Sequence, residues 1–182
     1  KHTSPSRRVV VTGSECTGKT TLTQGLAEYF DCPYSPEGAR LYVEQHKRPL
    51  TVADVDPIAS LQMALEEAAV RKAHDLVIHD TDLVSTLVYA RHYYETSPEW
   101  IVRTAADRAA DLYLLCDIDL PWVSDGLQRD NGSVEQRREI HEKFVDAMVS
   151  AGLHWTLIRG SGEERLEQAV HRIERSEEHT SE

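Results

Sequence analysis

Hydrophobic positions follow two alternating patterns along the chain. Short apolar runs rich in β-branched residues predict buried strands, and apolar residues that recur every three to four positions predict helices. The predicted strands cover residues 8–12, 32–35, 76–80, 111–116 and 154–158. A helical pattern follows each strand, so we expect an α/β fold. It should contain one five-stranded parallel sheet, with helices on both faces and right-handed connections.

Polar residues mark several expected helix starts. Asp56, just before a proline, is predicted to cap one helix, and Ser97, also before a proline, another. Ser133 opens a Ser-x-x-Gln pattern that predicts a capping box. The Asp-, Gly- and Asn-rich residues 119–132 predict a mobile loop or lid.

The segment between the first strand and the first helix carries the strongest chemical signal. Residues 13–20 read Gly-Ser-Glu-Cys-Thr-Gly-Lys-Thr. Glycines let the backbone curl around phosphates, and the N–H groups and dipole of the following helix attract anions. In this pattern Lys19 reaches the β- and γ-phosphates, and the Thr20 hydroxyl ligates Mg²⁺. The segment therefore predicts a phosphate-binding loop for a nucleoside triphosphate.

Two acids follow the third predicted strand. The carboxyl ends of parallel strands line the ligand crevice, so Asp80 is expected to meet the Mg²⁺ held by Thr20, directly or through water. Thr81 stands where ATP-hydrolysing motors carry a glutamate that activates water, which favours transfer to an acceptor. Asp82 is a candidate for holding or deprotonating an acceptor hydroxyl, and the alternative is that it only caps the next helix.

The segment after the second predicted strand is a candidate acceptor site. Glu37 is expected to bind a hydroxyl or act as a base, and Arg40 to bind phosphate or pair with Glu37. For Glu37 the alternative is a first-turn residue that suits the helix dipole. Gln62 lies on the helix expected to overhang this pocket, and its alternative is an ordinary solvated helix position.

The predicted lid carries further candidates. Trp122 follows a strand end, where it is expected to stack on a flat ligand or cover a cation, unless it is a hydrophobic plug. Arg129, in the same segment, is a candidate for binding the transferring phosphoryl group. Arg137 and Arg138 are weaker candidates, and a solvated helix face is the preferred interpretation of Arg138.

Charge and composition narrow the expected partners. The 182 residues include 20 Lys and Arg against 31 Asp and Glu, a formal net charge of −11. A nucleic-acid surface needs a basic stripe, so we expect small-molecule partners and no nucleic acid. The apolar runs are shorter than a membrane span, so no membrane is expected either. Three cysteines, an odd number, favour reduced thiols and a cytoplasmic location.

The end of the chain has an unusual composition. Residues 175–182 resemble the translation of a common sequencing-library adapter, so we expect them to be foreign and the kinase-like domain to span 7–174. Without them the formal charge changes only to −9, so the expected partners stay the same.

Four motifs in this order and spacing together resemble a known family. They are Gly13-Ser-Glu-Cys-Thr-Gly-Lys-Thr20, Glu37-Gly-Ala-Arg40, Asp80-Thr-Asp82 and Asp119-Leu-Pro-Trp-Val-Ser-Asp-Gly126. The chain is similar to the ribosylnicotinamide kinase domain of the bacterial NAD biosynthesis and regulation proteins. The resemblance implies a nucleotide-kinase-like P-loop fold that transfers phosphate from ATP to nicotinamide riboside, giving nicotinamide mononucleotide. It also implies that a fused or upstream adenylyltransferase domain can accompany the kinase.

The resemblance also implies roles for particular residues. The ATP phosphates are expected on Gly13, Ser14, Glu15, Cys16, Thr17, Gly18, Lys19, Thr20 and Thr21, and Mg²⁺ near Thr20 and Asp80. The riboside is expected near Glu37, Asp82, Trp122 and Asp125. Family members often carry the lid arginine at the position of Gln128, whereas here it follows at Arg129. A kinase of another nucleoside or small metabolite, and an ATP-binding regulatory module, remain the alternatives.

Overall fold

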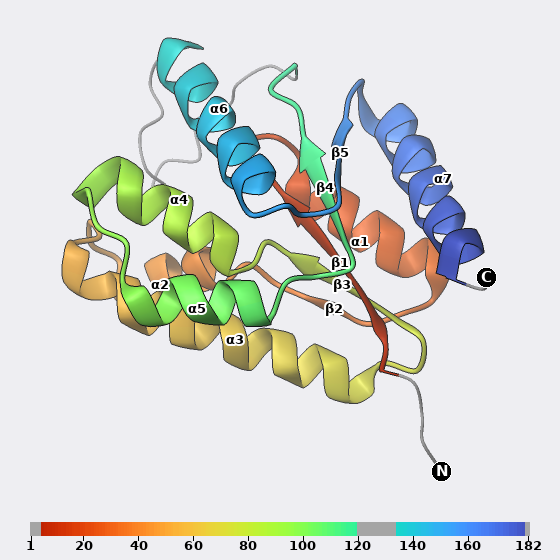
Figure 1. Cartoon of the computed structure of the whole chain (residues 1–182), viewed down its shortest axis with the longest axis horizontal. Helices are drawn as coiled ribbons and strands as arrows, with labels where there is room; N and C mark the ends of the chain where they lie inside the picture. The colour runs from red at the N-terminus through yellow and green to blue at the C-terminus, as the bar shows by residue number, and fades with distance from the viewer. Residues whose placement is uncertain (1–4, 120–133, 181–182) are drawn as a thin grey trace.

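The sheet matches the sequence-based expectation. The computed structural model describes residues 5–119 and 134–180, without the side chains of 177–180. Within these residues the strands are β1 (Arg7–Thr12), β2 (Tyr34–Ser35), β3 (Leu76–Asp80), β4 (Leu112–Cys116) and β5 (Trp155–Ile158). They form one five-stranded sheet in the order β2-β3-β1-β4-β5, and every neighbouring pair is parallel (Figure 1). The predicted parallel α/β fold is therefore confirmed.

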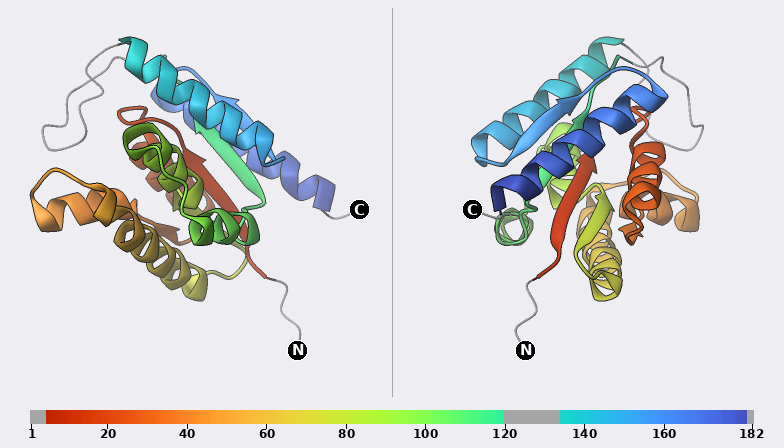
Figure 2. Two further views of the ribbon diagram at one scale, coloured as in Figure 1. Left: turned by 60° about the vertical axis from the view of Figure 1, so that its left-hand side comes forward. Right: turned by 90° about the vertical axis from the view of Figure 1, so that its right-hand side faces the viewer.

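Helices connect the strands and cover both faces of the sheet. They are α1 (Lys19–Phe30), α2 (Gly38–His46), α3 (Val55–Lys72), α4 (Leu83–Tyr94), α5 (Glu99–Asp107), α6 (Val134–Ser150) and α7 (Gly162–Thr180). Helices α1 and α7 pack on one face. Helices α4 and α6 lie beside each other on the opposite face (Figure 2), where α3 also contacts β2 and β3. None of the helices among the described residues is long and apolar enough to span a membrane.

The central strand shows why the apolar runs are continuous. Val9 and Val11 of β1 pack toward α1 and α7, whereas Val10 packs toward α4 and α6. All three are fully buried, because a strand covered on both faces needs apolar residues at successive positions. This arrangement brings the ends of β1 and β3 together, where Val11 is paired with Asp80.

Several predicted boundaries need correction. The second strand is shorter than predicted, covering Tyr34–Ser35 rather than 32–35. The predicted cap Asp56 lies inside α3, because Asp54 occupies the cap position, and Asp56 instead accepts a hydrogen bond from Trp100 Nε1 at 2.8 Å. Helix α5 begins next to Ser97 as expected, but the serine hydroxyl accepts a bond from Arg91 Nε at 2.6 Å and does not cap the helix. Ser133, the predicted start of a capping box, lies outside the described residues.

Candidate active site

The phosphate-binding loop connects β1 to α1 in a conformation that requires its glycines. Gly13 has φ +137°, and a Cβ there would lie 3.0 Å from the Cys116 carbonyl oxygen on β4. Gly18 has φ +78° at the cap position of α1. Cys16 also adopts a left-handed conformation, with φ +60°. The Thr17 hydroxyl closes the loop by donating to the Ser14 carbonyl at 2.7 Å. The backbone is thus curled where a phosphate would be held.

Lys19 is the first residue of α1 and lies almost fully buried inside the loop. Its Nζ donates to the Ser14 carbonyl at 3.1 Å. Burial alone would lower the pKa of Lys19, but the negative charges of Glu37, Asp80 and Glu15 outweigh it and raise the pKa above its usual value. The ammonium group therefore stays charged in a cluster of acids, ready to bind phosphate oxygens.

Thr20 and Asp80, the two residues expected to hold Mg²⁺, are in direct contact. The Thr20 hydroxyl donates to Asp80 Oδ2 at 2.8 Å, across the adjacent ends of α1 and β3. Asp80 Oδ1 is buried and has no hydrogen-bond partner among the described residues. Burial and the nearby charge of Glu37 raise the pKa of Asp80. A hydroxyl beside a carboxylate with an unsatisfied buried oxygen fits a hard divalent cation such as Mg²⁺.

A cavity adjoins this site between α2, α3 and α4. Glu37, Arg40, Gln62 and Thr81 supply part of its polar lining. Its apolar walls come from Ala39, Val43, Leu50, Val55, Ile58, Tyr89, Ala90 and Tyr94. A second hollow of about 80 Å³ lies beside it, lined by Thr20, Asp80, Glu37 and Arg40 among others. Glu37 and Arg40 line both spaces, so they lie between the cavity and the contact of Thr20 with Asp80.

Asp82 does not belong to this cavity. Its Oδ1 accepts the Val84 N–H at 3.0 Å and caps α4, and its Oδ2 accepts the Tyr113 hydroxyl at 2.6 Å. The side chain is buried, and burial raises its pKa. Both oxygens thus have protein partners on the α4 side of the sheet. The structure therefore favours the helix-cap interpretation and corrects the expectation that Asp82 holds the acceptor.

The remaining predicted residues are divided between described and undescribed parts of the chain. Gln62 lines the cavity, but its amide already binds three protein groups. Trp122, Asp125 and Arg129 lie outside the described residues. On α6, Arg137 is buried, whereas Arg138 is exposed, as its preferred interpretation expected.

Arg165 on α7 is a residue that the sequence analysis missed. It is buried, and its guanidinium donates to the Thr17 carbonyl at 2.8 Å, the Gly160 carbonyl at 2.6 Å and the Asp117 carbonyl at 3.0 Å. It also pairs with Asp119. Arg165 thus connects α7 to the phosphate-binding loop and to the segments that follow β4 and β5. Its position four residues before the buried Ala169 was a signal, because it places a charge on the core-facing side of the helix.

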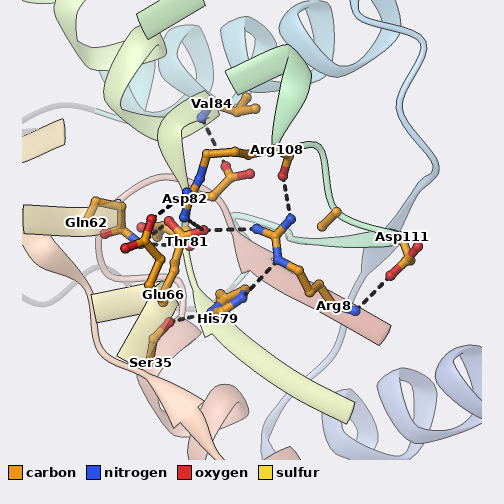
Figure 3. Close-up of polar contacts among 12 residues, drawn as sticks. Arg8, Ser35, Gln62, Glu66, His79, Thr81, Asp82, Val84, Arg108 and Asp111 are labelled. Carbon is orange, nitrogen blue, oxygen red and sulfur yellow. Dashed lines mark hydrogen bonds and ion pairs between the residues drawn. The ribbon is translucent and has the colours of Figure 1, made fainter. Parts of the chain in front are cut away.

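A buried polar network beneath the cavity was also missed. Arg8 on β1 donates to His79 Nε2 at 3.3 Å and to Glu66 Oε1 at 3.0 Å, and His79 Nδ1 shares a hydrogen bond with Ser35 at 2.7 Å (Figure 3). Arg108 lies 3.7 Å from Glu66. Burial and the two arginines lower the pKa of His79 to about 3, so it is neutral. Sequence spacing gives no sign that these residues meet.

Known proteins similar to this chain include relatives that were solved with a bound nucleotide. A family model described as an AAA domain matches residues 8–165. The trifunctional NAD biosynthesis/regulator protein NadR of Escherichia coli (strain K12) is 31% identical over 156 residues. Among solved structures, NadR protein in complex with NR has a TM-score of 0.81 at 28% identity, over 94% of this chain and 50% of that one. NadR protein in complex with NAD and AMP-PNP has a TM-score of 0.81 at 27% identity, over 94% and 49%.

The alignment to the E. coli protein covers 84% of this chain but only 38% of that protein, so the likeness concerns one part of a longer relative. The family match extends from β1 to the start of α7 and includes the whole phosphate-binding loop. The chain therefore belongs to the AAA domain family and is homologous, over most of its length, to one part of the trifunctional NAD biosynthesis/regulator proteins.

Proposed function

We propose that this chain is an ATP-dependent kinase that phosphorylates nicotinamide riboside to nicotinamide mononucleotide. One observation carries the proposal: Glu37 and Arg40 line both the hollow that contains Thr20 and Asp80 and the cavity beside it. A phosphate donor and an alcohol acceptor can therefore approach each other across these two side chains. The relatives solved with NR and with AMP-PNP support the choice of riboside and ATP.

Each residue has a role that follows from its surroundings. The curled backbone of residues 13–18 and the ammonium of Lys19 bind the phosphates. When bound at Thr20 and Asp80, Mg²⁺ would neutralise charge on the phosphate oxygens. Glu37 lines both the cavity and the hollow that contains Thr20 and Asp80, so we assign it, rather than Asp82, to hold or deprotonate the acceptor hydroxyl. Most of the catalysis is then positioning and electrostatic stabilisation.

Other expectations belong to the same proposal. Trp122 and Asp125 remain candidates for binding the riboside, and Arg129 for stabilising the transferring phosphoryl group. All three cysteines are free thiols, which supports a cytoplasmic location. The greater length of the E. coli relative supports the idea of a fused domain in this family.

The test is a mass-spectrometric assay of the protein with Mg²⁺·ATP and an equimolar mixture of nicotinamide riboside, uridine, cytidine and adenosine. We expect nicotinamide mononucleotide as the main product. Preferred phosphorylation of uridine or cytidine would replace the proposed acceptor by another nucleoside. Tight ATP binding without phosphoryl transfer would instead favour a regulatory module.

A further inference from the structure

The Gln62 side chain joins three separate segments around the acceptor cavity. Its Oε1 accepts the Gly38 N–H at 2.8 Å, and its Nε2 donates to the Thr81 carbonyl at 3.2 Å and to Glu66 Oε2 at 3.1 Å. Figure 3 shows the bonds from Gln62 on α3 to Thr81 and Glu66. The side chain is buried, and both hydrogens of its amide are used. Only one lone pair of Oε1 has no partner among the described residues.

The bond to Gly38 replaces the usual cap of α2. The first N–H groups of a helix have no partner within the helix, and the residue at the cap position normally supplies one. Glu37 occupies that position but makes no capping side-chain bond among the described residues. Gln62 caps α2 from a neighbouring helix instead, so the Glu37 carboxylate does not have to fold back onto its own helix.

The contact leaves little room for a side chain at position 38. A Cβ on Gly38 would lie 2.9 Å from Gln62 Oε1 and 3.1 Å from the Gln62 Cα. Any side chain there would push the start of α2 away from α3. The glycine and the glutamine thus fix the distance between the two helices next to Glu37.

The second bond holds an unusual backbone. Thr81 has φ +66°, a left-handed conformation that costs energy for a β-branched residue. Its N–H donates to the Val11 carbonyl at 2.8 Å, and its carbonyl accepts from Gln62. Thr81 lines the cavity and directly follows Asp80. Gln62 therefore ties the segment that carries Glu37 to the segment that carries Asp80.

The orientation of the amide is determined by its neighbours. Glu66 is held by Arg8 at 3.0 Å, and its Oε2 faces the Gln62 Nε2. A flipped amide would place Oε1 against two acceptors, Glu66 and the Thr81 carbonyl, and Nε2 against the Gly38 N–H. The arrangement therefore has one satisfied state, which suits a group that sets geometry.

We infer that Gln62 is a positioning residue that sets Glu37 against the phosphate site, rather than a ligand of the acceptor. The inference rests on the proposed function, because Glu37 faces the acceptor only if the cavity binds one. It replaces the sequence-based expectation that Gln62 itself binds substrate.

Two substitutions separate positioning from direct binding. Gln62→Met removes all three hydrogen bonds, whereas Gln62→Glu keeps an oxygen for Gly38 and for any ligand but loses both donors. If Gln62 positions Glu37, both variants should lose about tenfold or more in kcat/KM for the riboside, because small misplacements of a catalytic group are costly. KM for ATP should stay within about twofold of wild type. A Gln62→Glu variant close to wild type, or a Gln62→Met variant close to wild type, would overturn the inference. Gln45→Met, an exposed position of α2, is the matched control.

A measurement without substrate keeps this test independent of the proposed function. Hydrogen exchange of the Gly38 amide, followed by NMR, should be at least about tenfold faster in Gln62→Met than in wild type, and unchanged in Gln45→Met. Unchanged exchange in Gln62→Met would contradict the inference. If wild type phosphorylates no riboside, the proposed function fails, yet Gly38 exchange still decides whether Gln62 caps α2. Should Gln62→Glu fail to fold, Gly38→Ala perturbs the same contact. We expect this variant to lower kcat/KM for the riboside and to leave KM for ATP within about twofold of wild type.

Discussion

The phosphate-binding loop and the acceptor cavity, which adjoin each other, are built in different ways. The loop is one contiguous segment, and its shape comes from its own backbone, with left-handed conformations at Cys16 and Gly18. The cavity is assembled from α2, α3, α4 and the residues after β3, and side chains such as Gln62 hold these parts together. A contiguous backbone site tolerates change in its surroundings, whereas an assembled one depends on buried polar contacts between distant residues.

In the proposed function the two regions have different tasks. Triphosphates are alike in every nucleotide, so a fixed loop suits them. An acceptor must be distinguished from similar molecules, and buried polar groups that require partners give that discrimination.

Replacing the loop lysine should have the largest effect. Lys19→Ala removes a buried charge that faces Glu37 and Asp80. We expect turnover with ATP and the riboside to fall by about two to three orders of magnitude, the range for one preorganised electrostatic donor. Steady-state kinetics measure this, with the exposed Lys72→Ala on α3 as control. Near-normal turnover in Lys19→Ala would rule out the proposed mechanism.

The network beneath the cavity should link stability to pH. Burial and the nearby charge of Asp82 raise the pKa of Glu66 from 4.5 to about 7. The folded state then binds more protons than the unfolded state, so this contribution is present below pH 4.5 and is lost as the pH rises to about 7. Glu66→Gln removes this pH-dependent contribution to stability. Wild type should therefore lose up to about 3 kcal/mol of unfolding free energy, relative to the variant, as the pH rises from 4.5 to about 7.

Urea unfolding at several pH values measures this difference. His79 has the opposite linkage, because its pKa is lowered to about 3 and its contribution is lost as the pH falls from 6.5. His79→Gln should therefore give a difference of the opposite sign. Between about pH 4.5 and 6.5 the two contributions oppose each other in wild type, so each must be measured as a difference between proteins. A flat difference for Glu66→Gln would mean that Glu66 has the same pKa in the folded and the unfolded protein.

Two acids near the site should respond differently to neutralisation. Glu37→Gln should lower kcat by about a hundredfold, the lower end for a general base, because phosphoryl transfer has a loose transition state. Asp82→Asn disturbs the cap of α4 and the Tyr113 bond, so it should mainly lower stability, by about 1–3 kcal/mol. Kinetics and thermal unfolding of both variants test this. A larger loss of kcat in Asp82→Asn would return the base role to Asp82.

The same contrast explains what could be predicted from the sequence. Local patterns identified the strands, the loop and the pairing of Thr20 with Asp80, because each depends on residues close in sequence or on the alignment of strand ends. The sequence leaves Asp82 with two interpretations, because only the position of Tyr113 shows that both carboxylate oxygens accept hydrogen bonds. The contact of Arg8 with Glu66, and of Gln62 with Gly38, arises from helix packing, which spacing along the chain does not encode.

Replacing Arg165 should have the smallest effect. It tests whether the phosphate-binding loop also depends on a distant side chain. The loop is contiguous, yet its Thr17 carbonyl is held by an arginine 148 positions later in the chain. Arg165→Leu leaves the carbonyls of Thr17, Gly160 and Asp117 without their donor, so the loop should lose rigidity rather than its shape. We expect KM for ATP to rise by about tenfold, since a loosened loop loses part of its preorganisation, while KM for the riboside stays within about twofold. Steady-state kinetics with the exposed Arg71→Leu as control measure both constants. An equal rise in both KM values would mean that Arg165 supports the loop and the cavity alike. A rise in KM for ATP alone would show that Arg165 supports only the loop, and that even a loop shaped by its own backbone depends on one distant side chain.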